Sequence, residues 1–260
     1  QNGSGNGLAN RIVGNAIANS LFGAAGADTL EAGAGNDTLE GGLGIDSLIG
    51  GVDSDLYIVE GQADVIVEAL NAGSDTVQAT AGAAYTLGAN LEDLMLLGTV
   101  VEGNGNALAN RITGNASNNI LRGADGADLL LGGDGSDTLI GGNGSDTMTG
   151  GAGNDVFRLN AAAQSTTAAP DVITDFANTA GVGDRIEFTL IDANPLLGGD
   201  QPFTYIGDQA FTAGLPGRVR YTDLGGGDYR IEGDIDGNAV ADFAIRVTAA
   251  SGPEAGWFIL

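Results

Sequence analysis

The 260-residue chain contains no cysteine and no histidine. It therefore has no thiol nucleophile and no Ser-His-Asp triad, and it cannot form a zinc site from the usual nitrogen and sulfur ligands. Any metal site must be built from oxygen ligands. These are abundant, because 34 residues are Asp or Glu.

Basic residues are also scarce. The nine that are present are all arginine, only Arg11 lies before residue 110, and the formal net charge is −25. No basic stripe is available to neutralise phosphates, so we expect no nucleic-acid partner. The longest apolar runs, such as 94–101, fall short of the roughly 18 residues of a membrane-spanning helix, so we expect no membrane span. The chain begins with Gln1 and has no charged-then-apolar leader, which we interpret as the start of an excised or processed piece.

Glycine, in contrast, is frequent, with 46 of 260 residues. This is well above the usual share of roughly 7% and indicates either disorder or a regular turn that requires glycine. A hydrophobic content of 43% argues against disorder. The sequence therefore favours a folded chain built from glycine-rich turns.

The glycines belong to a nine-residue repeat. Six nonapeptides run without a slip from Gly5 to Ile58, and six more run from Gly105 to Arg158. The eighth position of every unit is apolar, whereas its two neighbours are mixed, which is the pattern of a short strand with one buried face. These apolar residues are Ile12, Leu21, Leu30, Leu39, Leu48, Tyr57, Ile112, Leu121, Leu130, Leu139, Met148 and Phe157.

Three-residue strands do not pair stably alone, so successive units must stack on one another. The predicted fold is all-β: a parallel β-roll, or β-solenoid, with two nonapeptides in each coil. Each unit is expected to consist of a six-residue turn followed by a three-residue strand.

Units such as GGAGNDVFR, which begins at Gly150, resemble the calcium-binding nonapeptide GGxGxDxUx of the RTX family, where U is a large apolar residue. The resemblance implies that the turns bind Ca²⁺. The chemistry agrees with this, because glycines let carbonyl oxygens converge, aspartate adds charge, and calcium prefers hard oxygen ligands. Asp and Gly also favour turns without any metal. Eight aspartates in register favour calcium over turn chemistry alone.

Two nonapeptides per coil bring together turns that are 18 residues apart. Four sites with two carboxylates follow, and we expect at least four calcium ions; the pairs are Asp28 with Asp46, Asp37 with Asp55, Asp128 with Asp146, and Asp137 with Asp155. Positions two and four of each turn are expected to direct their carbonyl groups at the same ion. The glycines assigned to the sites are Gly26, Gly33, Gly35, Gly42, Gly44, Gly51, Gly126, Gly133, Gly135, Gly142, Gly144, Gly151 and Gly153.

Some units depart from the family pattern. Asp53 replaces the glycine at position four of its unit and either strengthens or distorts the site at Asp55, so it is included among the metal candidates. Alanine replaces glycine at residues 24, 32 and 124. The pairs with a single carboxylate are expected to be weak or empty, with their asparagines serving in the turns; they are Asn10/Asp28, Asn19/Asp37, Asn110/Asp128 and Asn119/Asp137.

The periodicity suggests four segments: a first repeat block (1–58), an irregular β-solenoid linker (59–104), a second repeat block (105–158) and a C-terminal module (159–260). In the last segment, DVITDF, GDRIEF, FTYIGDQAF, RVRYT and DIDGNAVADFAIRV resemble, in order, the C-terminal module of serralysin metalloproteases. That resemblance, over about 171–260, implies a cap on the β-roll and a signal for type I secretion. The tail 254–260 is either this signal, an edge strand of the cap, or both.

A second metal candidate lies within the cap. The stretch 234–242 spaces Asp234, Asp236 and Asn238 like the start of an EF-hand loop, with Asp242 further on. Ile245 stands where the loop would need its glutamate. We therefore favour a β-hairpin with a polar turn.

No catalytic residue is expected in this chain, because the HExxH motif of the serralysins requires histidine. The preferred hypothesis is a non-catalytic calcium-binding region of a protein that is secreted by a type I machine and folds outside the cell on binding calcium. One alternative is a surface-layer or adhesin protein that self-associates through calcium. The other is a targeting module of a secreted polysaccharide enzyme, similar to the repeat modules of alginate epimerases. All three imply an extracellular or cell-surface location.

Overall fold

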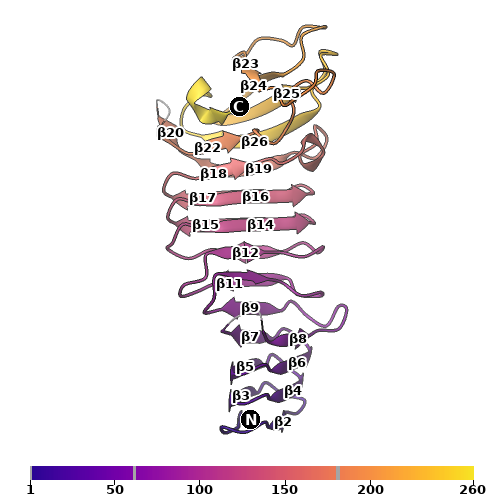
Figure 1. The fold of residues 1–260 in the computed structure, drawn as a ribbon, viewed down its shortest axis with the longest axis vertical. Helices are drawn as coiled ribbons and strands as arrows, with labels where there is room; N and C mark the ends of the chain where they lie inside the picture. Colours follow the sequence, from indigo (N-terminus) through magenta and orange to yellow (C-terminus); the bar gives the residue numbers. More distant parts are fainter. Residues whose placement is uncertain (1, 61–62, 180–181) are drawn as a thin grey trace. The chain divides into compact units, whose positions relative to one another are not determined.

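The computed structural model describes residues 2–60, 63–179 and 182–260 (Figure 1). The chain forms two compact units, residues 1–115 and 116–260. The regular secondary structure of both is almost entirely β-strand, and the only helical segments in the described residues are two short 3₁₀ turns, η1 (Ala162–Gln164) and η2 (Ala255–Trp257). The predicted all-β class is confirmed. The four-part division at residues 58, 104 and 158 follows the repeat in the sequence and stays a proposal.

The first unit is a stack of parallel strands that alternate between two sides of the coil. One side contains β1 (Asn2–Ser4), β3 (Ser20–Ala25), β5 (Thr38–Leu43), β7 (Leu56–Val59), β9 (Thr76–Ala79), β11 (Asp93–Leu96) and β13 (Arg111–Thr113), paired in that order. The other contains β2 (Arg11–Val13), β4 (Thr29–Ala34), β6 (Ser47–Val52) and β8 (Val65–Val67), followed by the pair β10 (Ala84–Thr86) and β12 (Glu102–Asn104). Every one of these pairings is parallel, which confirms the predicted β-roll.

Within the repeats the register advances by two nonapeptides per coil. Leu21 pairs with Leu39, and Leu39 pairs with Tyr57. The apolar residues at position eight are thereby stacked inside the coil, where all are buried except Ile12, which is half-buried. The core of each repeat block is therefore a column of one large side chain per nonapeptide.

The strands are longer than the sequence analysis expected. Strands such as β5 and β16 (Thr138–Asn143) extend for six residues, from position seven of one nonapeptide to position three of the next. The expectation of a three-residue strand and a six-residue turn was wrong. The reason is that the backbone of positions two and three also pairs with the next coil, as in Ala24 with Gly42. Only positions four to six remain as the turn.

Parallel pairing continues between residues 59 and 104, where the nonapeptide is lost. Tyr57 pairs with Val77, Val77 with Leu94, and Leu94 with Ile112. These coils are unequal in length, and their strands still place apolar residues inside. Val77, Leu94 and Ile112 are fully buried.

The second unit begins as a parallel roll of the same kind. One sheet contains β14 (Ile120–Asp125), β16, β18 (Val156–Arg158), β22 (Arg185–Glu187) and β27 (Phe258–Ile259), paired in that order. The other begins with β15 (Leu129–Asp134), β17 (Thr147–Ala152), β19 (Asp171–Phe176) and β26 (Phe243–Ala249). Figure 1 shows β14 and β15 at one level of this roll and β16 and β17 at the next.

The second of these sheets then changes direction to form the cap. β26 pairs antiparallel with β25 (Asp228–Asp234), which pairs antiparallel with β24 (Arg218–Gly225), and β23 (Thr204–Tyr205) lies along β24. A short hairpin of β20 (Asn178–Thr179) and β21 (Val182–Gly183) lies apart from them. Phe188, Phe243 and Trp257 are almost fully buried and give the cap the aromatic core that the repeats lack. The tail 254–260 contributes β27 to this packing, with Phe258 buried.

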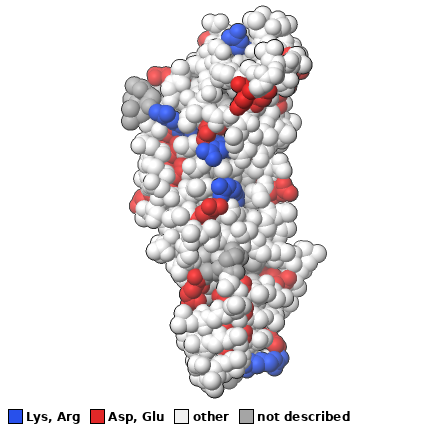
Figure 2. All heavy atoms as spheres, viewed as in Figure 1, with Lys and Arg blue, Asp and Glu red and all other residues white. Residues whose placement is uncertain are grey.

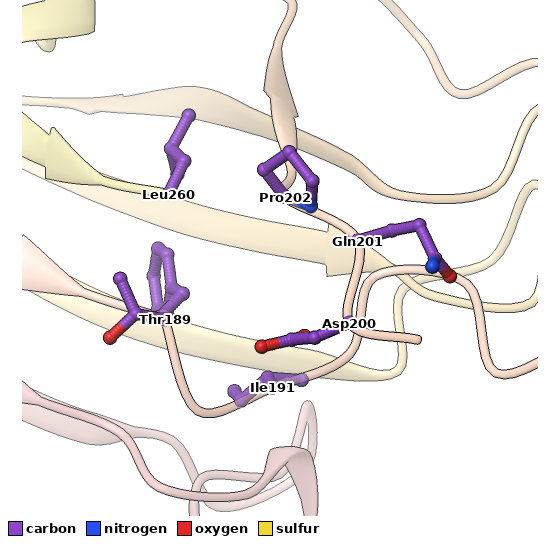
Figure 3. A pocket seen from close by; sticks show the side chains of 7 residues that line it. Thr189, Ile191, Asp200, Gln201, Pro202 and Leu260 are labelled. Carbon is purple, nitrogen blue, oxygen red and sulfur yellow. The ribbon is translucent and has the colours of Figure 1, made fainter. Parts of the chain in front are cut away.

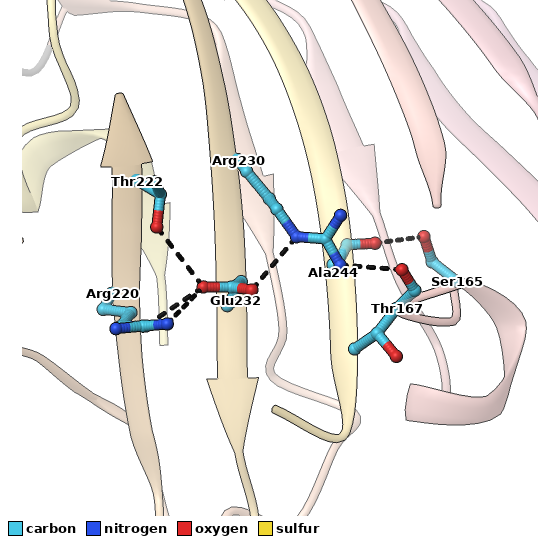
Figure 4. A network of polar contacts seen from close by, with 7 residues as sticks. All are labelled: Ser165, Thr167, Arg220, Thr222, Arg230, Glu232 and Ala244. Atoms are coloured by element: carbon cyan, nitrogen blue, oxygen red, sulfur yellow. Dashed lines mark hydrogen bonds and ion pairs between the residues drawn. The ribbon is translucent and has the colours of Figure 1, made fainter. Parts of the chain in front are cut away.

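A polar network holds the cap hairpin to the preceding loop (Figure 4). The Glu232 carboxylate, on β25, accepts hydrogen bonds from Arg220 and Arg230, both at 3.0 Å. Arg230 also donates to the carbonyl oxygen of Thr167 at 2.7 Å, and the Ser165 hydroxyl donates to that of Ala244 at 2.6 Å. Arginine therefore has a structural role here, in ion pairs that surround a nearly buried carboxylate.

Candidate metal centre

The aspartates at position six form a ladder along each edge of the roll. The backbone N–H of Asp28 donates to Oδ1 of Asp46 at 2.7 Å, and that of Asp37 donates to Oδ1 of Asp55 at 2.7 Å. The same bonds join Asp128 to Asp146 at 2.9 Å and Asp137 to Asp155 at 2.8 Å. The structure thus brings together each of the four aspartate pairs that the spacing predicted.

In each of these eight aspartates the second carboxylate oxygen, Oδ2, is buried and accepts no hydrogen bond. A buried charged oxygen without a partner costs free energy, so such atoms are rare unless a ligand satisfies them. The eight are Asp28, Asp37, Asp46, Asp55, Asp128, Asp137, Asp146 and Asp155, all at most 3% exposed. They are the same eight that the repeat singled out.

Seven of the eight unpartnered oxygens lie against the glycine at position one of their own nonapeptide; the unit of Asp37 has Ala32 there. A Cβ atom placed on Gly23 would lie 2.5 Å from both Asp28 Oδ2 and the carbonyl oxygen of Gly41, one coil further on. A Cβ on Gly132 would likewise meet Asp137 Oδ2 and the Gly150 carbonyl oxygen. Position one was not among the residues assigned from the sequence, although eleven of the twelve units have glycine there. The assignment of the carbonyl ligands to positions two and four stays a prediction.

The donor set fits a hard cation. It offers anionic carboxylate oxygens beside backbone carbonyl oxygens and no nitrogen or sulfur, which is the chemistry of calcium sites. Burial raises the pKa of Asp137 to about 6 and also raises the pKa of Asp37, Asp146 and Asp155. These carboxylates are therefore poorly stabilised in the charged form, and a bound cation would supply the missing stabilisation.

All thirteen glycines assigned to the turns have positive φ angles, between 87° at Gly42 and 155° at Gly153. The turns also stack closely, since a Cβ on Gly144 would overlap the carbonyl oxygen of Gly126 in the preceding coil. Ala24 and Ala124 hold the same conformation, with φ angles of 84° and 85°. The turn geometry is kept, and these two alanines adopt a strained, left-handed backbone conformation.

Asp53 also adopts a positive φ, 76°, but its carboxylate is exposed. Its Oδ2 atom accepts a hydrogen bond from the backbone N–H of Gly35 at 3.0 Å, one coil before. One carboxylate oxygen of Asp53 is therefore hydrogen-bonded to the backbone of the neighbouring turn. Its role as a ligand stays a prediction.

The asparagines at position six differ from the aspartates. Oδ1 of Asn10 accepts a hydrogen bond from the backbone N–H of Asn6 at 2.7 Å, and Oδ1 of Asn19 accepts one from Asn15 at 2.8 Å. Asn110 accepts in the same way from Asn106 at 2.7 Å. The backbone N–H of Asn19 still donates to Asp37, and that of Asn119 donates to Asp137. Asparagine therefore continues the ladder while using its oxygen inside its own turn.

The stretch 234–242 forms the turn between β25 and β26, which is a hairpin, as favoured. One oxygen from each of Asp234, Asp236 and Asp242 lies within 4.8 Å of the others. Backbone N–H groups occupy them, however: Gly237 and Ala239 donate to Asp234, and Ile235 donates to Asp242. These carboxylates organise the turn.

The cap also contains a shallow pocket lined by Thr189, Ile191, Asp200, Gln201, Pro202 and Leu260 (Figure 3). Asp200 is its single charged side chain. The pocket lacks the converging acid, base and nucleophile of an active site.

On the face in Figure 2, acidic side chains are scattered with only a few arginines among them. None of the described segments forms a helix that is long and apolar enough to cross a membrane.

The fold and its aspartate ladders define a β-roll of RTX calcium-binding nonapeptide repeats. The profile of that repeat, in four copies, matches residues 4–39 and 32–66. The profile described as the peptidase M10 serralysin C terminal matches residues 96–255, more than half of the chain. The chain belongs to this family. The match begins well before residue 171, where the sequence analysis placed the resemblance, and therefore includes the second run of nonapeptides.

Two solved structures that match part of the chain are subunits from the Azotobacter vinelandii mannuronan C5-epimerase. The AlgE6R2 subunit is 24% identical, with 61% of this chain and 91% of that chain covered and a TM-score of 0.42. The AlgE6R3 subunit is 23% identical, with 58% and 78% covered and a TM-score of 0.39. No curated protein sequence matches the chain.

Proposed function

We propose that this chain is a non-catalytic calcium-binding region of a secreted bacterial protein and that calcium binding drives its folding. The eight buried carboxylate oxygens without hydrogen-bond partners support this proposal most directly. Four pairs would hold the ions: Asp28/Asp46, Asp37/Asp55, Asp128/Asp146 and Asp137/Asp155. The carbonyl groups and glycines of the same turns complete the binding surface. When bound, calcium supplies the positive charge that these carboxylates lack.

The energetics favour coupling between binding and folding. A chain with a net charge of −25 repels itself when compact, and glycine-rich turns lose much conformational entropy on folding. The metal-free chain is therefore expected to be largely unfolded. Because the paired carboxylates come together only in the folded coils, the free energy of calcium binding becomes free energy of folding.

The same coupling suits export. Extracellular calcium modules typically bind calcium at roughly 10⁻⁴ to 10⁻³ M, far above the concentrations that cytosolic sensors detect. A chain tuned to this range would stay unfolded before export and fold outside the cell. Membership of the serralysin C-terminal family supports type I secretion and an extracellular or cell-surface location. Any catalytic activity would belong to other parts of the parent protein.

The test is far-UV circular dichroism of the chelator-treated protein during titration with calcium, with magnesium as the control ion. We expect a cooperative gain of β signal near millimolar calcium and none with magnesium. The double variant Asp137→Asn/Asp155→Asn should require more calcium. The matched control Asp200→Asn/Asp208→Asn, in surface loops of the cap, should titrate like the unaltered protein. A fully folded spectrum in chelator would refute calcium-coupled folding.

A further inference from the structure

A group of three acids lies where the first run of nonapeptides ends. Asp55 immediately precedes β7, Glu68 immediately follows β8, and Asp75 immediately precedes β9. One carboxylate oxygen from each lies within 4.8 Å of the other two. Two of these acids, Glu68 and Asp75, lie outside the nonapeptides, so the repeat pattern does not account for the group.

The oxygens converge on one point beside Gly50. A Cβ atom placed on Gly50 would have Asp55 Oδ2, the Tyr57 hydroxyl and Glu68 Oε1 all within 2.7 Å. Asp55 is only 3% exposed, and this Oδ2 is one of the buried atoms without a hydrogen-bond partner. A buried, unpartnered carboxylate oxygen is thus directed at two further oxygen ligands.

The Tyr57 hydroxyl is fixed in this position. Tyr57 is fully buried, and its hydroxyl accepts a hydrogen bond from the Gly50 backbone N–H at 2.8 Å while donating to Glu68 Oε1. Asp75 is joined to the group through its Oδ1 atom, which accepts a hydrogen bond from the Asp55 backbone N–H at 2.8 Å. The four side chains therefore form one connected cluster.

No cation compensates the three carboxylates within the described residues, because the arginine ion pairs there involve other acids. Burial raises the pKa of Asp55 to about 7 and also raises the pKa of Glu68 and Asp75. The cluster is thus deficient in positive charge at neutral pH.

The second run of nonapeptides provides an internal comparison. The stretch 64–78 resembles 171–188, so that Phe157 stands in the place of Tyr57, Asp175 in that of Glu68 and Asp184 in that of Asp75. In the first copy Glu68 Oε2 accepts a hydrogen bond from the Ala69 backbone N–H at 3.2 Å, and Oε1 is held by Tyr57. In the second copy backbone N–H groups occupy both oxygens of both acids. Asp175 accepts from Gly150 at 3.0 Å and from Gly151 at 2.8 Å.

Asp184 is occupied in the same way. It accepts hydrogen bonds from the backbone N–H groups of Asp155 at 2.9 Å and of Ala177 at 2.8 Å. The same scaffold therefore appears twice, and only the first copy directs a hydroxyl and a longer acid toward the free aspartate oxygen.

We propose that Asp55, Tyr57, Glu68 and Asp75 bind one calcium ion in a site of their own, which ends the first run of repeats. All its ligands are hard oxygens from three segments of the chain, a combination that suits calcium better than magnesium, which demands near-ideal octahedral geometry and retains several waters. The site shares only Asp55 with the aspartate pairs. It takes the place of a further aspartate pair at the point where the nonapeptide repeat stops.

The first test is equilibrium dialysis of the full chain with radioactive calcium. Glu68→Gln keeps the size of the side chain and removes its charge, and should reduce the bound calcium by one ion per chain or weaken one site at least about tenfold, since a hydrogen-bonded charge is lost. The matched control is Asp175→Asn, at the counterpart position, which should leave the number of ions unchanged. Equal binding by Glu68→Gln and the unaltered protein would overturn the proposal.

Tyr57→Phe gives an independent measurement. It keeps the buried ring, as Phe157 does in the second copy, so the fold should persist, as circular dichroism at saturating calcium would verify. With terbium as the probe ion, emission excited through tyrosine should fall in this variant, because the phenol lies next to the bound ion. Unchanged emission would refute the site even if Glu68→Gln failed to fold. If the unaltered protein bound no calcium at all, the proposed function itself would fail.

Discussion

At the scale of single residues, the glycines at position four of neighbouring coils stack so closely that no side chain fits between them. Gly144 has a φ of 145°, and a Cβ there would overlap the Gly126 carbonyl oxygen. Gly144→Ala should therefore destabilise the calcium-loaded protein by at least about 2 kcal/mol, from backbone strain together with steric overlap. Urea unfolding at a fixed calcium concentration measures this change.

The control is the reverse substitution at a strained alanine. Ala124 already holds a φ of 85°, so Ala124→Gly relieves strain while raising the entropy of the unfolded chain. We expect a stability gain of at most about 1 kcal/mol. If Gly144→Ala were neutral, or if Ala124→Gly were as harmful as Gly144→Ala, the close stacking of the turns would be disproved.

The aspartates of the candidate sites were easier to predict from the sequence than the carbonyl groups around them. The eight aspartates were identifiable because charge, position and period coincide in the repeat, and the structure leaves an oxygen of each without a partner. The carbonyl oxygens next to them were not identifiable, because which carbonyl faces the carboxylate depends on how strands extend into the turn. Tyr57 was assigned to the core from its position alone, since only the pairing of β8 with β6 brings Glu68 to its hydroxyl.

At the scale of the elements, the cap supplies the last rung of both aspartate ladders in the second unit. Asp171, at the start of β19, accepts from the Asp146 backbone N–H at 3.0 Å, and Asp184, before β22, accepts from that of Asp155. Both acids are 2% exposed. The cap thus completes the hydrogen bonding of the final nonapeptides as well as covering their core.

Asp171→Ala should therefore leave a buried N–H without an acceptor and destabilise the protein by about 1–3 kcal/mol. Burial raises the pKa of Asp171 to about 7 from the usual 3.8, so unfolding is best compared at or below pH 4, where proton uptake by this carboxyl on folding contributes little. Asp171→Asn retains an acceptor and should recover most of the loss. Equal destabilisation by the two variants would show that the rung does not act through this hydrogen bond.

Element lengths and the cap were only partly predictable. The period of nine fixed the coil and its buried column, as in Leu39 stacked between Leu21 and Tyr57. Strand ends were misjudged because glycine at positions one and two has weak strand propensity, whereas pairing between coils overrides it. Networks such as Glu232 with Arg220 and Arg230 join residues brought together by antiparallel pairing, which no local pattern specifies.

At the scale of the whole molecule, the buried carboxyls make the metal-free protein sensitive to pH. Burial raises the pKa of Asp55 and Asp171 to about 7, and that of Asp137 and Asp184 to about 6, from the usual 3.8. Between these values the folded state binds more protons than the unfolded state, so the free energy of unfolding falls as pH rises. The stabilisation is complete near pH 4 and lost above about pH 7.

We therefore expect metal-free protein to gain β signal as the pH is lowered from about 8 to about 5, with circular dichroism as the measurement. Saturating calcium should abolish this dependence, because the ion takes the place of the protons. A metal-free protein that lost structure on acidification over this range would contradict the raised pKa values.

The ladders also have a direction along the chain. The backbone N–H of each aspartate at position six donates to an aspartate of the following coil, so a turn depends on residues that come later in the sequence. On a ribosome, which makes the chain from its N-terminus, every donor is therefore synthesised before its acceptor. In the second unit the last acceptors, Asp171 and Asp184, emerge only after the final nonapeptide. Completion of the hydrogen bonding in the roll is therefore delayed until the cap has been translated.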